Sequence, residues 1–280
     1  MQEIVGAWQS DLRLDIRQYV NGISEIQMLR CASCRLEFFA PPSLVGSPEL
    51  YEQLEKLDLY YIPRKWEHDV ALRELDGCHR GLEIGCGFGD FVERALLVCP
   101  AFEGCEQNLS AIRVAQSRGL PVNHLSLEEL SASRARQYDA VCSFQVLEHV
   151  ANPARFLQDC ATLLRPGGKL MLGLPNGDSF LKYQFNVLDM PPHHMTRWTS
   201  DVLRNVPKLF PFALDRIEFE PLPEYQVDAY VNAYSSAAVA RGARPLTSTR
   251  IRRHIQRVVR RSSLRRFLKG QTLHALFTRL

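Results

Sequence analysis

The segment Glu83-Ile84-Gly85-Cys86-Gly87-Phe88-Gly89-Asp90 is the part of this sequence best suited to holding a ligand. The apolar residues 81–84 predict a short strand, and residues 91–98 predict a helix. Glycines let the backbone turn tightly and approach a ligand closely, and the helix N-terminus offers unpaired N–H groups. Asp90 stands where a dinucleotide-binding fingerprint has its third glycine, so the segment departs from that fingerprint.

An acidic residue, Glu106, ends the next expected strand, residues 102–106, and lies 21 positions after Gly85. A carboxylate at the end of this second strand can accept hydrogen bonds from both hydroxyls of a ribose. The glycine-rich turn and Glu106 together predict a nucleoside-containing ligand. The alternative is a tight turn without any ligand.

Three histidines are candidates for acid–base chemistry. His193 and His194 follow Pro191-Pro192, in a loop expected to cap the substrate side of the site, and His149 follows Glu148. An imidazole titrates near neutral pH and can remove a proton from an oxygen nucleophile. We favour His194 slightly as the base; the alternative is that the pair only caps the loop and that His149 supports it.

Cys31 and Cys34 have the spacing of half a zinc ribbon. Tetrahedral zinc needs four ligands, but no second cysteine pair precedes these residues and the first histidine is His68. We therefore expect a degenerate ribbon without metal.

The elements that must position these residues alternate between strand and helix. Such alternation predicts an α/β fold, a Rossmann-like, doubly wound, mostly parallel sheet with helices on both faces. Its ligand should lie beyond the carboxyl ends of the strands. The remaining expected strands are 121–125, 138–144, 169–174 and 213–219, and the remaining helices are 110–118, 153–164, 199–206 and 224–240.

Three regions follow from this pattern. Residues 1–77 are an N-terminal region, irregular up to residue 46 and then helical, with Pro63 separating two lid helices. Residues 78–222 form the core, and residues 223–280 form a helical extension. No final antiparallel strand is evident after Phe219, so we expect a degenerate sheet edge.

Charge is distributed unevenly along the chain. From residue 241 onward there are 12 Lys and Arg and no acids, so the rest carries 22 basic and 31 acidic residues. Residues 248–280 are expected to form basic amphipathic helices outside the catalytic core. Three interpretations stay open: the helices pack on the acidic body, lie on an anionic membrane, or bind nucleic acid.

The overall composition, 46% hydrophobic and 23% charged, is that of a globular protein and excludes a largely disordered, collagenous or coiled-coil chain. No run of 18 apolar residues occurs, and no secretory signal is expected in the first 30 residues. Eight scattered cysteines indicate free thiols in a reducing cytoplasm. We expect a cytoplasmic protein, with contact at the inner face of the membrane left open.

Taken together, the motifs resemble those of the class I S-adenosylmethionine-dependent methyltransferases, from about residue 81 to residue 220. The resemblance rests on the motif at 83–89, Glu106, Tyr138-Asp139-Ala140-Val141, Leu147-Glu148-His149-Val150 and Leu164-Arg165-Pro166-Gly167-Gly168. It implies S-adenosyl-L-methionine as the cofactor. The implied cofactor-binding residues are Glu83, Gly85, Cys86, Gly87 and Gly89 at the methionine end, Glu106 and Gln107 at the ribose, Ser126 and Leu127 at the adenine, and Phe144 and Gln145 toward the sulfonium and substrate.

The Pro-Pro-His-His segment is similar to that of a subgroup near the ubiquinone-pathway O-methyltransferases. This implies O-methylation of a small molecule, a lipid-linked precursor or a glycan. Some relatives have an acid of a divalent-metal site where Gln145 stands, so no metal is expected there either. Tyr61 and Trp66 lie in the expected lid and are candidates for substrate contact. The alternatives are a nucleic-acid-associated methyltransferase, disfavoured because no amide-gripping motif follows the fourth strand, and an inactive assembly protein.

Overall fold

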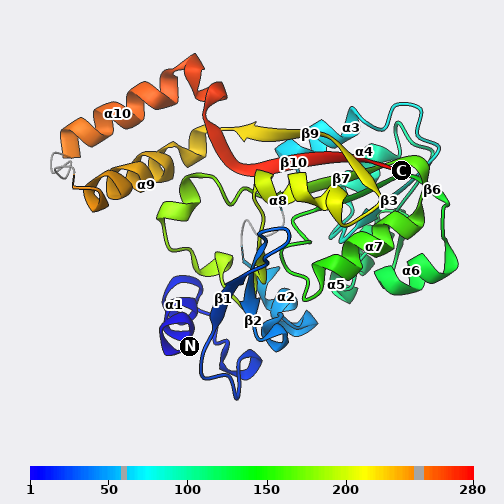
Figure 1. The fold of residues 1–280 in the computed structure, drawn as a ribbon, viewed down its shortest axis with the longest axis horizontal. Coiled ribbons are helices and arrows are strands. Elements are labelled where there is room, and N and C mark those ends of the chain that lie inside the picture. Colours follow the sequence, from blue (N-terminus) through cyan, green and yellow to red (C-terminus); the bar gives the residue numbers. More distant parts are fainter. Residues whose placement is uncertain (58–61, 243–248) are drawn as a thin grey trace.

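The computed structural model describes residues 1–57, 62–242 and 249–280. Its centre is a seven-stranded sheet with the order β5-β4-β3-β6-β7-β10-β9 (Figure 1). The strands from β3 to β7 pair in parallel, and β10 is antiparallel to both β7 and β9. The predicted α/β, Rossmann-like fold is confirmed. The strands are β3 (Arg80–Ile84), β4 (Ala101–Cys105), β5 (Val122–Asn123), β6 (Tyr138–Phe144), β7 (Leu164–Pro175), β9 (Phe212–Pro221) and β10 (Lys269–Arg279).

Helices cover both faces of this sheet, and each face has its own apolar core. One core includes Leu157 and Leu203, and the other includes Phe91 and Ile112. The helix starts follow local chemistry: the Asn108 side chain accepts the Ser110 N–H at 2.9 Å to begin α5. The helices are α3 (Trp66–Leu72), α4 (Asp90–Ala95), α5 (Leu109–Ser117), α6 (Leu127–Ser133), α7 (Pro153–Leu163) and α8 (Ser200–Asn205).

The N-terminal region is more regular than expected. Residues 1–46 hold a helix and two strands, and these strands form a second sheet with the short strand β8 in the order β1-β2-β8. Trp8, Ile16, Phe39 and Leu50 form a separate core there. The expectation of irregular structure was wrong because the strands are only four residues long and β8 comes from far along the chain. The elements are α1 (Gln2–Leu12), β1 (Gln27–Arg30), β2 (Glu37–Ala40), α2 (Pro48–Leu54) and β8 (Thr196–Arg197).

The C-terminal extension was predicted to be helical throughout, and the structure differs from this prediction in its last part. Helix α10 (Thr249–Arg261) is basic as predicted and lies beside α9 (Val227–Ala240) (Figure 1). Residues 269–279, however, are not helical: β10 inserts between β7 and β9 and completes the sheet. The expected core of 78–222 is therefore incomplete without these residues, and the sheet edge is not degenerate. None of the described helices combines the length and apolar character needed to span a membrane.

Ending the chain after Leu268 removes β10 and should abolish cooperative folding. Leu273, Leu276 and Phe277 are each at most 3% exposed, and burying such a side chain is worth about 1.5–3 kcal/mol. Their summed loss approaches the whole stability of a typical domain, about 5–15 kcal/mol. Thermal unfolding followed by circular dichroism tests this. A control chain that lacks only the exposed Leu280 should melt like the full chain, and a cooperative transition in the shorter one would contradict the role of β10.

Candidate functional site

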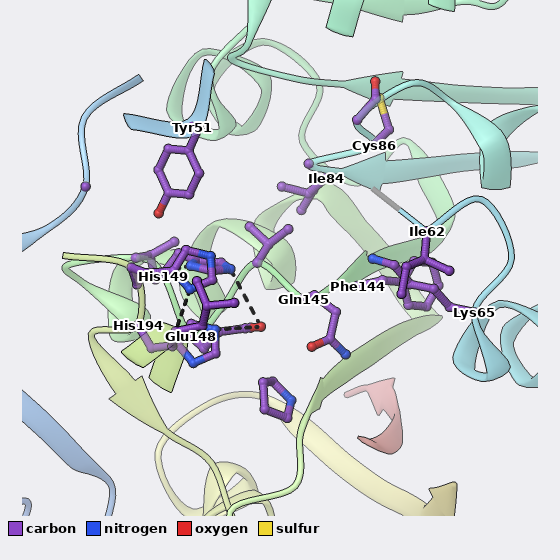
Figure 2. A pocket seen from close by; sticks show the side chains of 18 of the residues that line it. Tyr51, Ile62, Lys65, Ile84, Cys86, Phe144, Gln145, Glu148, His149 and His194 are labelled. Carbon is purple, nitrogen blue, oxygen red and sulfur yellow. Dashed lines mark hydrogen bonds and ion pairs between the residues drawn. The ribbon is translucent and has the colours of Figure 1, made fainter. Parts of the chain in front are cut away.

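A cavity of about 1250 Å³ lies at the carboxyl ends of β3, β4 and β6. Loops that follow parallel strands meet at one edge of the sheet, and this edge faces the N-terminal region. The cavity lining comes from these loops, from the segment joining α2 to α3, and from residues 186–194. Figure 2 shows the labelled side chains around its interior, with Cys86 and Ile84 on one side and His149 and His194 on another.

The glycine-rich turn forms one wall of the cavity. Gly85 has φ +72°, and a Cβ there would lie 2.4 Å from Val146 Cγ2, so no other residue fits without rearrangement. Gly87 also has a positive φ, 52°, and lines the cavity together with Cys86. Gly89 does not line it: Gly89 precedes α4, and a Cβ there would meet Leu120. Gly89 therefore shapes the start of the helix rather than the wall of the cavity.

Glu106 connects this turn to the next helix. Its Oε2 accepts the Gly87 N–H at 2.9 Å, and its Oε1 accepts the N–H groups of Gln107 at 2.7 Å and Asn108 at 2.8 Å. A carboxylate has about four acceptor positions, so Oε2 keeps one for a ligand. Gln107 lies beside it and donates from Nε2 to the Leu125 carbonyl at 3.2 Å.

Glu83 is a buried acid in the floor of the cavity. It is 3% exposed, and its Oε2 has no hydrogen-bond partner among the described residues. Burial raises the pKa of this carboxyl well above its usual value, while the charge of Lys65 opposes that rise. A cationic ligand group would satisfy this carboxylate.

Ser126 and Leu127 line the far end of the cavity. The Ser126 hydroxyl accepts the Glu129 N–H at 3.2 Å, and Glu129 in turn accepts from Ser126. This capping box starts α6 and fixes the direction of the loop. The Ser126 side chain is therefore already engaged within the chain.

Phe144 and Gln145 end β6 and face the middle of the cavity (Figure 2). Gln145 has φ +58°, a conformation that residues other than glycine seldom adopt. Its N–H donates to the Gly173 carbonyl at 2.8 Å, and its side-chain Nε2 donates to Glu67 Oε1 at 3.0 Å. Strained residues of this kind gather at functional sites, where surrounding structure holds them.

The three candidate histidines line the cavity and lie close together. The ring centroids of His149 and His193 are 4.4 Å apart, and those of His149 and His194 are 4.8 Å apart. His149 Nδ1 donates to the His193 carbonyl at 2.8 Å, and His193 Nδ1 donates to the Leu188 carbonyl at 2.8 Å. The rings of His193 and His194 are also stacked, with centroids 4.6 Å apart, so the three imidazoles are in mutual contact.

Glu148 is buried beneath the histidines. Its Oε1 lies 3.7 Å from His149 Nε2 and 4.0 Å from His194 Nε2. Burial raises the pKa of Glu148 to about 8 and lowers the pKa of His149 to about 4. The pKa values of His193 and His194 are also lowered well below their usual value, mainly by burial. All three imidazoles are therefore neutral at pH 7.

Several cavity residues carried no signal in the sequence. Glu67, which holds Gln145, lies on α3, and Asp189, whose Oδ1 is 3.3 Å from His194 Nδ1, precedes the histidine loop. Only contacts across the fold reveal them. Trp66 lines the cavity, whereas Tyr61 lies outside the described residues.

Cys31 and Cys34 lie in the turn between β1 and β2, and both are free thiols. Within the described part of the chain, the only cluster of three or more potential metal ligands is His149, His193 and His194. The cysteine pair therefore has no third ligand among these residues.

A parallel sheet with this glycine turn after β3 and this acid after β4 defines the class I methyltransferase architecture. The methyltransferase domain family matches residues 58–272 of the chain, and the chain belongs to that family. The predicted class, a methyltransferase, is thereby confirmed. Solved structures agree in fold: a SAM-dependent methyltransferase from Archaeoglobus fulgidus matches with a TM-score of 0.54 at 20% identity, over 84% of this chain and 95% of that one.

Curated relatives are similar over a shorter stretch. A ubiquinone biosynthesis O-methyltransferase of Caulobacter vibrioides is 37% identical over 123 residues, which cover 39% of this chain and 49% of that protein. The enzyme of the same name from Xanthomonas axonopodis pv. citri is 34% identical over 120 residues, or 41% of this chain and 50% of that protein. The chain thus spans about half the length of these relatives.

Proposed function

We propose that this protein is an S-adenosylmethionine-dependent O-methyltransferase that acts on a small molecule. The observation that carries the proposal is the single cavity that joins the glycine turn and Glu106 to the histidine cluster. The similarity to relatives named O-methyltransferases supports an oxygen acceptor. We also propose a reducing, cytoplasmic compartment, as the scattered cysteines of the sequence indicate.

The residues of the cavity fit the cofactor. Glu83 Oε2, which has no hydrogen-bond partner among the described residues, suits the ammonium group of the methionine part of the cofactor, and Glu106 Oε2 has an acceptor position left for a ribose hydroxyl. Gly85 and Gly87 let the backbone approach closely. Ser126 and Leu127 lie where the adenine would bind, and Phe144 and Gln145 would flank the sulfonium.

The cofactor supplies a methyl group on a positively charged sulfur: the sulfur–carbon bond breaks as the oxygen–carbon bond forms, and the acceptor loses its proton. The chain contributes orientation and proton removal. Glu67 holds the side chain of Gln145 in the wall of the cavity. His194 directs Nδ1 toward Asp189 Oδ1 at 3.3 Å, which leaves the lone pair on Nε2 to accept a proton. Holding the reacting atoms in line supplies much of the acceleration in such reactions.

The cavity can contact both apolar and charged parts of a substrate. Its lining includes Val45, Leu57 and Leu188, which bind apolar surface by removing it from water, and the charged residues Arg13 and Arg64. The proposal therefore covers a small molecule, a lipid-linked precursor or a glycan as substrate.

Replacing Glu106 by Ala should weaken S-adenosylmethionine binding. Hydrogen bonds to a charged group contribute about 1.5–3 kcal/mol, which corresponds to a loss of affinity of about 10- to 150-fold. Isothermal titration calorimetry measures this directly. Glu128→Ala, an exposed acid on α6, is the matched control and should bind normally. Equal affinity in the two variants would overturn the ribose assignment.

Replacing His194 by Ala should lower turnover by about 10²- to 10⁴-fold, the usual contribution of a general base. Cofactor affinity should not change. Since burial keeps the pKa of His194 far below 6.5, the wild-type rate should show no histidine-type rise between pH 6 and 8. His124→Ala, which alters an exposed histidine, is the control. Normal turnover of His194→Ala with an accepted substrate would make the residue structural.

We further propose peripheral contact with an anionic membrane through α10. Ile255 and Val259 pack against the core beneath α9, so part of the apolar stripe is used within the chain. Ile251, Val258 and Phe267 are 52%, 53% and 73% exposed. The exposed arginines of this segment are Arg250, Arg253, Arg257, Arg261 and Arg266. An exposed apolar row beside exposed arginines is typical of helices that lie on anionic bilayers.

Arg253→Gln with Arg257→Gln should reduce binding to phosphatidylserine vesicles about 30-fold, because each basic residue near such a surface contributes about 1 kcal/mol. Vesicle flotation at low salt measures the effect. The double variant Arg113→Gln with Arg136→Gln removes the same charge from exposed sites elsewhere and should float like wild type. If wild-type protein fails to float, the membrane proposal is wrong, and salt-sensitive retention on duplex DNA would instead favour the nucleic-acid alternative.

A further inference from the structure

We propose that His149, His193 and His194, with Glu148 beside them, form a binding site for one divalent transition-metal ion. The sequence led to the opposite expectation, because Gln145 stands at a position where a ligand acid was sought. The cluster uses other residues, which come from two loops 44 positions apart in the chain.

The distances between the candidate ligand atoms are only slightly longer than those in a metal-bound site. One ligand atom from each histidine lies within 4.8 Å of the others. Zinc–nitrogen bonds of about 2.0–2.1 Å in a tetrahedral site put neighbouring ligand atoms about 3.3 Å apart. The cluster therefore needs to contract by about 1.5 Å at most. Glu148 Oε1 lies 3.7 Å from His149 Nε2 and 4.0 Å from His194 Nε2.

In each imidazole, Nδ1 faces an oxygen atom, and this contact orients the ring. Nδ1 of His149 faces the His193 carbonyl, Nδ1 of His193 faces the Leu188 carbonyl, and Nδ1 of His194 faces the Asp189 carboxylate. The two carbonyl oxygens only accept hydrogen bonds, so the protons of His149 and His193 belong on Nδ1 and Nε2 is the nitrogen able to bind a metal. The Asp189 carboxylate favours the same arrangement in His194. Such outer partners, carbonyl or carboxylate, are characteristic of histidines that bind metals.

The buried carboxyl group of Glu148 is independent support for a bound cation. It is 1% exposed, and neither carboxylate oxygen has a hydrogen-bond partner among the described residues. A buried carboxyl without partners is expensive in free energy. A metal ion between Oε1 and the two nearby Nε2 atoms would satisfy it.

The ligand set selects the kind of ion. Imidazole suits zinc, cobalt, nickel, iron and copper, whereas magnesium and calcium prefer oxygen ligands throughout. The residues line the same cavity as Gln145, so an acceptor hydroxyl can reach the ion. A bound cation lowers the pKa of an oxygen that coordinates it. This use of the site rests on the proposed function: the metal would favour loss of the acceptor proton to solvent before methyl transfer, in place of direct proton transfer to His194.

Cobalt(II) is a suitable probe because its visible absorption reports the ligands. Full-length protein carrying Cys31→Ser and Cys34→Ser, stripped with a chelator, should bind one cobalt ion per chain with visible bands and without thiolate charge-transfer absorption. Zinc should displace the cobalt. Absence of cobalt binding in this otherwise wild-type chain would overturn the proposal whatever the behaviour of further variants.

Single variants then locate the ion. His149→Ala and His194→Ala should each weaken cobalt binding at least 100-fold, and Asp189→Asn, which alters an outer partner, should weaken it about 10- to 100-fold. His124→Ala is the control and should bind like its parent. Unchanged binding in the His149 and His194 variants would exclude this site. Glu148→Gln, which retains shape, should weaken cobalt binding while keeping the fold.

S-adenosylmethionine calorimetry on the same samples separates the two proposals. Cobalt binding without cofactor binding would reject the proposed function and leave the metal site intact. Cofactor binding without cobalt binding would reject the metal site alone.

Discussion

The seven-stranded sheet depends on β10, which is the last strand in the chain. β10 pairs with β7 on one side and with β9 on the other, so neither ladder exists until residues 269–279 are in place. The helical pair α9 and α10 is consequently an insertion between two neighbouring strands, β9 and β10, rather than an appendage after the core. Its exposed arginines project from a segment whose two ends are both fixed in the sheet.

The two halves of the cavity are built by different means. On the cofactor side, backbone N–H groups converge on Glu106, so the shape follows from β4, the glycine turn and the start of α5. On the acceptor side, side chains from distant segments meet, and burial raises the pKa of Glu148 and lowers the pKa of His149. The first half suits a ligand common to a family, and the second half can vary with the substrate.

This division also explains what the sequence could predict. The strand–helix alternation, the glycine turn and Glu106 are local patterns, and they predicted the parallel part of the sheet and most of the cofactor side. The run Leu273-His274-Ala275-Leu276-Phe277 has the apolar continuity of a buried strand, but the arginine-rich helix before it suggested a helical tail. The β2–β8 pairing, the support of Gln145 by Glu67 and the contact of Asp189 with His194 join positions without any shared periodicity. Such contacts cannot be read from a single sequence.

One backbone residue, Met195, links the histidine loop to both parts of the molecule. Its N–H donates to the Glu148 carbonyl at 2.7 Å, and its carbonyl accepts the Phe39 N–H at 2.9 Å. Phe39 belongs to the N-terminal core, whereas Glu148 belongs to the floor of the cavity. Met195 therefore links the N-terminal region to the histidine loop through the backbone, and the rings of Trp8 and Tyr51 add side-chain contacts with His193. Glu55 of the same region accepts hydrogen bonds from Asn108 and Ser110 at the start of α5. A displacement of the N-terminal region by a bound acceptor would therefore reach both the histidines and the loop that carries Glu106.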